Sequence, residues 1–242
     1  MQQKHFFFLS LIAAATLVGF YSCKKNCAAP TPPTNTFLYD GFTYHTITIP
    51  GAGTWTVENA RNTHFNNGDP IRNAQTDAEW KDSTNKKIAA KTSDTGAWCY
   101  YNNTNSTDTQ SRYGKLYNWY AVKDARGLAP EGWRVATDAD FINLKTALGD
   151  SAGHKLKSID YWTTDDGSQK PKRNSSGFTV VPAGLRNGNG NFYNIGSNGY
   201  FWSSTELNSG NAWYQSLNYN GAGAYRYGIT KLLGCSVRFV RD

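Results

Sequence analysis

The segment between Tyr113 and Gly149 constrains the fold more than any other part of the sequence, because its second half predicts one well-defined helix. Thr137 is a favourable N-cap residue, and Asp140 stands where the acidic member of a capping box belongs. Apolar residues then recur at helical spacing, namely Phe141, Leu144 and Leu148. Gly149 follows as a typical helix stop. The pattern therefore predicts a helix from about 138 to 148 with one apolar face.

The first half of this segment is rich in aromatic residues, which predicts a core nearby. Tyr117, Trp119 and Tyr120 lie within four positions of one another. Rings this large are stabilised chiefly by burial. We expect the segment to be scaffold, because it contains no set of catalytic side chains.

Residues 132–141 read Gly-Trp-Arg-Val-Ala-Thr-Asp-Ala-Asp-Phe. They resemble the Gly-Trp-His-Val-Pro-Thr-Asp-Ala-Glu-Trp signature of the Fibrobacter succinogenes major paralogous domain. Residues 199–206, Gly-Tyr-Phe-Trp-Ser-Ser-Thr-Glu, and the C-terminal Gly-Cys-Ser-Val-Arg-Phe-Val-Arg-Asp resemble two further motifs of that family. The resemblance covers residues 37–242. It implies an α+β, C-type lectin-like fold of the formylglycine-generating-enzyme branch, rich in loops, with short antiparallel strands and one or two helices.

The remaining pattern predicts mostly short strands. Alternation predicts strands at residues 43–49 and 54–57, and an apolar run predicts a buried strand that starts near residue 177. A capped turn predicts a short helix at residues 76–80, and residues 102–111 are polar enough to indicate a loop. At the C-terminus, alternation places Cys235, Val237 and Phe239 on one inward face.

The N-terminus is typical of an export signal. Residues 6–21 form an apolar run too short for a comfortable membrane span, and Cys23 follows a small residue at its end. We expect residues 1–22 to be a lipoprotein signal peptide, Cys23 to be acylated, and the Pro/Thr-rich residues 23–36 to be an extended tether. The protein would then be an outer-membrane lipoprotein, on either membrane face. Secretion after cleavage elsewhere is the alternative.

Composition argues against nucleic acid as a partner. The formal net charge is +7, but the Lys and Arg residues are scattered and no dense basic run occurs. Aromatic residues make up 14% of the chain, with 8 Trp and 15 Tyr. Interleaved with Asn and Gly, they fit contact with sugar or protein.

The sequence offers no metal site and no nucleophile with a base beside it. His45, His64 and His154 are isolated, and no zinc, calcium, phosphate-loop or serine-hydrolase motif occurs. The resemblance implies that oxidase chemistry would need two cysteines near the C-terminus, where this chain has only Cys235. We therefore expect no enzyme activity and no cofactor. Cys99 and Cys235 are either a disulfide or two buried thiols.

Two functions fit these observations. One is a lipid-anchored binding protein whose C-terminal loops recognise a polysaccharide or protein, as in the ligand face of C-type lectin-like domains and in retroelement-diversified receptor-binding proteins. On that resemblance, the expected ligand-facing residues are Tyr214, Gln215, Ser216, Asn218, Asn220, Tyr225, Arg226 and Tyr227. Trp202, Trp213 and Leu217 are expected in the core. The other function is a structural part of an envelope assembly without a small ligand.

Overall fold

The computed structural model describes residues 35–84, 96–162 and 173–241. The chain divides into two units, Met1–Thr34 and Asn35–Asp242. The predicted signal peptide, Cys23 and nearly all of the predicted tether lie outside the described residues. The second unit begins two residues before the predicted domain start at residue 37, because Thr36 already pairs with His45.

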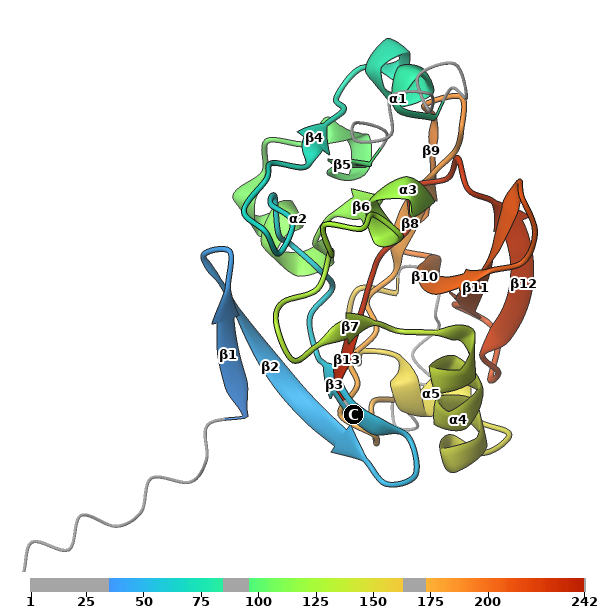
Figure 1. Ribbon diagram of the computed structural model, residues 1–242. Coiled ribbons are helices and arrows are strands. Elements are labelled where there is room, and N and C mark those ends of the chain that lie inside the picture. Colours follow the sequence, from blue (N-terminus) through green and yellow to red (C-terminus); the bar gives the residue numbers. More distant parts are fainter. Residues whose placement is uncertain (1–34, 85–95, 163–172, 242) are drawn as a thin grey trace, which may run out of the picture. The chain divides into compact units, whose positions relative to one another are not determined.

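The first of the described sheets joins segments from both ends of the second unit (Figure 1). Its strands, in spatial order, are β1 (Thr36–Tyr39), β2 (Phe42–Ile49), β3 (Gly53–Thr56), β13 (Phe239–Arg241) and β7 (Arg134–Val135). All of these pairings are antiparallel. The strands predicted at 43–49 and 54–57 are therefore confirmed, and β13 lies between β3 and β7.

The second sheet contains the predicted ligand-facing residues. In spatial order its strands are β12 (Tyr225–Thr230), β11 (Asn211–Asn218), β10 (Asn198–Glu206), β8 (Ala183–Arg186) and β9 (Phe192–Ile195). The β10–β8 pairing is parallel, and the others are antiparallel. The strand predicted from residue 177 forms a sheet ladder only from Ala183 onward.

A small sheet and short helices complete the described fold. The sheet has the order β4 (Arg72–Asn73), β5 (Ala97–Cys99) and β6 (Leu116–Tyr117). The helices are α1 (Asp77–Thr84), η1 (Tyr101–Asn103), α2 (Thr107–Tyr113), α3 (Trp119–Val122), α4 (Asp138–Leu148) and α5 (Ala152–Leu156). The fold is thus α+β, built mostly from sheets. The loop predicted at 102–111 is wrong, since α2 begins within it.

Helix α4 follows the sequence prediction closely. The Thr137 hydroxyl accepts from the backbone N–H of Asp140, and the Asp140 carboxylate accepts from the backbone N–H of Thr137, so the capping box is complete. Phe141 and Leu144 are buried. The helix ends at Leu148, before Gly149. Local signals alone account for this element.

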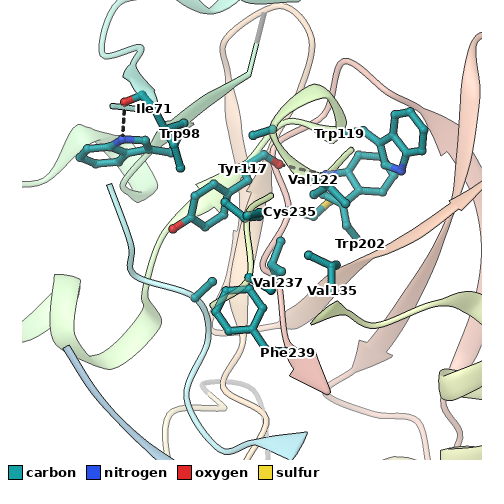
Figure 2. Packing of buried hydrophobic residues seen from close by; sticks show 14 of the residues in the cluster. Ile71, Trp98, Tyr117, Trp119, Val122, Val135, Trp202, Cys235, Val237 and Phe239 are labelled. Atoms are coloured by element: carbon teal, nitrogen blue, oxygen red, sulfur yellow. Dashed lines mark hydrogen bonds between the residues drawn. The ribbon is translucent and has the colours of Figure 1, made fainter. Parts of the chain in front are cut away.

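The largest hydrophobic cluster lies where the sheets meet, and Figure 2 shows its centre. Tyr117 and Trp202 are fully buried, and Nε1 of Trp202 donates to the carbonyl of Tyr117 at 2.9 Å. Nε1 of Trp98 donates to the carbonyl of Ile71 at 3.0 Å. Trp119 is also buried, which confirms the core expected around the aromatic segment. Each buried indole thus has a polar partner, as burial requires.

Cys99 and Cys235 are both buried free thiols. Strand β6 separates them, because its Leu116 pairs with Cys99 and its Tyr117 pairs with Cys235. Two strand spacings amount to roughly 10 Å, beyond the Cα separation that a disulfide can bridge. Burial raises the pKa of the Cys99 thiol to about 12, so the thiol stays protonated. The disulfide alternative is therefore wrong.

Several cations are buried together with backbone carbonyls and aromatic rings. Arg238 is fully buried, although the strand alternation predicts an outward position for it. Its guanidinium donates to Asn59 Oδ1 at 2.8 Å, and to the carbonyls of Thr56, Phe178 and Thr179 at 2.7, 3.2 and 3.2 Å. It therefore joins the first sheet to the segment before β8.

Lys115 is buried in the same manner, at 1% exposure. Its ammonium group lies 4.8, 4.6 and 5.0 Å from the ring centroids of Phe42, Trp98 and Tyr100, and it donates to the carbonyl of Arg61. Burial lowers the pKa of Lys115 from 10.5 to about 8. The folded protein therefore releases this proton at a lower pH than the unfolded chain.

We expect this shift to make the free energy of unfolding depend on pH. Between pH 8 and pH 10 the unfolded chain retains the Lys115 proton and the folded protein has lost it, so raising the pH stabilises the fold by about 2 kcal/mol. Lys115→Met lacks this contribution. Urea unfolding of the wild type and of Lys115→Met at pH 8 and pH 10 gives the change in the free energy of unfolding for each protein. The difference between the two changes is the contribution of Lys115. Identical responses would contradict the assignment.

Candidate binding surface on the C-terminal sheet

Strands β11 and β12 divide the predicted ligand-facing residues between two opposite faces. In the antiparallel register Tyr214 pairs with Tyr227 and Gln215 pairs with Arg226. Paired residues share a face, and neighbours along a strand point to opposite faces. The strands therefore place Gln215 and Arg226 on the face opposite the other predicted residues of β11 and β12, and Asn220 lies in the turn between the two strands.

One face carries Tyr214, Ser216, Asn218, Tyr225 and Tyr227, here called the tyrosine face. Tyr225 and Tyr227 are 37% and 50% exposed. Their ring centroids lie 6.5 Å apart, that of Tyr227 lies 5.9 Å from Tyr214, and that of Tyr214 lies 6.5 Å from Trp202. A continuous row of rings thus runs from the core to the surface.

The polar members of the tyrosine face are ordered by hydrogen bonds. Asn218 Oδ1 accepts from Asn198 Nδ2 at 2.7 Å and from the Ser216 hydroxyl at 3.1 Å. Ser216 is only 3% exposed, so it supports Asn218 instead of facing a ligand. Asn220 lies beyond β11, exposed in the turn that leads to β12. The amide groups at the surface of this face therefore come from Asn218 and Asn220.

The tyrosine face is uncharged. Burial raises the pKa of Tyr214 to about 12, so its hydroxyl remains protonated over the physiological range. None of the face's members is a charged residue. Recognition by this face would therefore depend on flat rings, hydroxyl groups and amides.

The other face carries Trp213, Gln215, Leu217 and Arg226, and it packs against α4. Arg226 donates from Nε and Nη2 to the two carboxylate oxygens of Asp138 at 2.7 and 2.8 Å. Its guanidinium carbon lies 3.2 Å from the ring centroid of Trp213. Leu217 is buried as expected and so is Trp202, whereas Trp213 is only half-buried, beneath Arg226.

Comparison with protein families settles which one this chain matches. The model of the Fibrobacter succinogenes major domain matches residues 49–241. The chain belongs to this family. Comparisons with curated proteins and with solved structures give no significant match.

The signature segment of this Fibrobacter succinogenes major domain also borders a cleft of about 630 Å³ that the sequence did not predict. Lys123, Asp124, Glu131 and Trp133 line it. The ring centroids of Phe37 and Trp133 lie 4.7 Å apart in a stacked arrangement, so Trp133 is part of a packed aromatic group. The loop at residues 127–132, which contains two Gly residues and one Pro, lines this cleft and is the sequence feature that could have indicated it.

The described residues of this family member contain no cluster of three or more His, Cys, Asp or Glu side chains that could hold a metal ion. Where the structure describes the chain, no helix combines the length and the apolar character needed to cross a membrane. His45 and His64 each contact one carboxylate, of Glu58 and Asp40. His154 is buried in α5.

Proposed function

We propose that this domain is a non-enzymatic binding module of the cell envelope, which recognises a carbohydrate or a protein through the tyrosine face. The exposed row formed by Tyr214, Tyr227 and Tyr225 is the observation that carries the proposal. Tyrosine offers a large, flat and amphipathic contact area with few rotatable bonds. Single exposed rings are common on soluble proteins, but a contiguous group of them often marks an interaction site.

The ring contacts support this function because they keep the surface rigid. Each ring in the row contacts the next, and the last lies against Trp202 in the core. A surface that is already ordered loses little conformational entropy when it binds. Asn218 and Asn220 beside the rings provide amides for hydrogen bonds with hydroxyl or peptide groups.

The wider proposal joins this surface to the N-terminal features. Acylation at Cys23 would anchor the chain to the outer membrane, and residues 23–36 would hold the domain away from the lipid. We include in the proposal that the domain is a C-type lectin-like fold, with which the α+β architecture is compatible. In that fold the C-terminal region commonly forms the ligand face.

We expect Tyr225→Ala combined with Tyr227→Ala to abolish ligand binding and to lower the free energy of unfolding by only about 1 kcal/mol, because both rings lie at the surface. Thermal unfolding and binding are measured on the same preparations. Tyr193→Ala, at 45% exposure on β9 of the same sheet, is the matched control and should bind as the wild type does. A large loss of stability in the double variant would show that these rings serve the core.

A glycan and polysaccharide array with residues 35–242 tests the proposed function directly, with and without calcium. Specific binding that the double variant loses would support recognition of carbohydrate. If no glycan binds, crosslinking in whole cells should capture a protein partner through the same face. Crosslinks that survive the double variant would favour a structural role in an envelope assembly.

A further inference from the structure

A groove of about 440 Å³ runs between α4 and the face of the sheet opposite the tyrosine face. Helix α4 contributes Phe141, Ile142 and Lys145, and the strands contribute Gln215 and Arg226. Asp150 lies just beyond the C-terminus of α4 and also lines the groove. The volume is within the range of small-molecule sites.

Gln215 is the unusual residue of this groove. It is only 4% exposed, yet its side-chain amide has no hydrogen-bond partner among the residues that the structure describes. Its polar atoms are not among the fully buried side-chain atoms that lack a partner, so the amide opens into the groove. The amide is therefore available to a ligand that enters the groove.

Arg226 presents a second donor, held in a fixed orientation. Asp138 accepts from its Nε and Nη2, so the pair fixes the guanidinium plane. Nη1 has no partner within the described part of the chain. Because both oxygens of the buried Asp138 accept from Arg226, that carboxylate is already paired and does not compete for Nη1.

Hydrogen-bond donors dominate the lining of the groove, although Asp138 and Asp150 balance the charges of Arg226 and Lys145. Lys145, Arg226 Nη1 and the Gln215 amide offer donors, whereas Asp150 at one end is the acidic side chain that lines the groove. Phe141 and the 45% exposed Ile142 supply an apolar wall. Charge-assisted hydrogen bonds to a carboxylate are the strongest that such donors form.

We propose that the groove binds the carboxylate of one uronic-acid residue, with the sugar ring against Phe141 and Ile142. Gln215 and Arg226 Nη1 donate to the carboxylate, and Lys145 adds a second positive charge. This site lies on the opposite face of β11 and β12 from the tyrosine face, so it is independent of the proposed function.

D-glucuronate tests the proposal, with D-glucose as the uncharged match that differs only at C6. Titration calorimetry is done on residues 35–242, which contain the hydrophobic clusters of the described fold. We expect glucose to bind at least about ten-fold more weakly than glucuronate. Equal affinity for the two sugars, or no binding of glucuronate, would overturn the proposal.

Gln215→Met separates a ligand-binding role from a structural one. It removes the amide while keeping the shape, so we expect little change in the melting temperature together with about ten-fold weaker glucuronate binding. Lys145→Gln, on the exposed side of α4, should weaken binding with no change in stability. Tyr225→Ala with Tyr227→Ala should leave glucuronate binding unchanged. Wild-type affinity in both Gln215→Met and Lys145→Gln would exclude the site.

Discussion

Replacing Arg238 by methionine is expected to lower the free energy of unfolding by about 3–5 kcal/mol, the largest effect of any single substitution considered for this domain. The guanidinium is fully buried and is the donor for three carbonyls and for the side chain of Asn59. Methionine fills much of the volume but offers no donor, so these acceptors would be left buried and unpaired. Chemical denaturation of the purified domain measures the loss.

Arg241→Met is the matched control, because Arg241 lies only three positions away but is exposed beside Trp133. Arg241→Met should lower the free energy of unfolding by less than about 1 kcal/mol. Arg238→Lys should fall between the two, since an ammonium group retains the charge but cannot reach all four acceptors. If Arg238→Met were as stable as Arg241→Met, the hydrogen bonds of Arg238 would not stabilise the contact between the first sheet and the segment before β8.

The second large effect is expected at Gly153 in α5, where alanine should destabilise the domain by about 3 kcal/mol. In a helix, replacing glycine with alanine usually stabilises by about 1 kcal/mol. Here a Cβ atom would lie 2.3 Å from the carbonyl oxygen of Gly223 and 2.7 Å from that of Ala222. Both contacts are with backbone, so the turn before β12 would have to move.

The position of this turn also affects the tyrosine face. The backbone N–H of His154 donates to Ala222, and Lys157 Nζ donates to the carbonyl of Gly221 at 2.6 Å. The Tyr225 ring packs over this same turn. Thermal unfolding of Gly153→Ala should therefore be compared with Asn143→Ala, an exposed position in α4 that should change stability by less than about 0.5 kcal/mol. A neutral or stabilising Gly153→Ala would contradict the packing described.

The elements that the sequence predicted well are those defined by local signals. Helix α4 has its cap, its apolar face and its stop within residues 137–149, and no distant contact is needed to recognise it. Helix α2 lacks these signals, since none of its residues is buried. Its caps are Ser106 and Gly114, but a polar segment between two such residues is equally typical of a loop.

The binding surface was predicted only in part, for reasons of strand geometry and tertiary packing. Consecutive residues such as Tyr214, Gln215 and Ser216 alternate between faces once their segment is a strand, but loops do not impose that alternation. For Arg238, the strand pattern alone gives the wrong side. Alternation predicts that it faces solvent, yet the segment at residues 177–179 covers that side and makes it part of the interior.

The central place of β13 in the first sheet bears on how the domain folds. Arg238 contacts Thr56, which lies 182 positions away in the sequence, and β2 and β13 are the neighbours of β3 in the sheet. Closing so long a loop costs conformational entropy before any contact compensates for it. Chains dominated by such distant pairings fold slowly, on the order of milliseconds to seconds. Strands β1 to β3 are consecutive and can pair with one another early, but β7 can join this sheet only through β13, when nearly the whole chain is present.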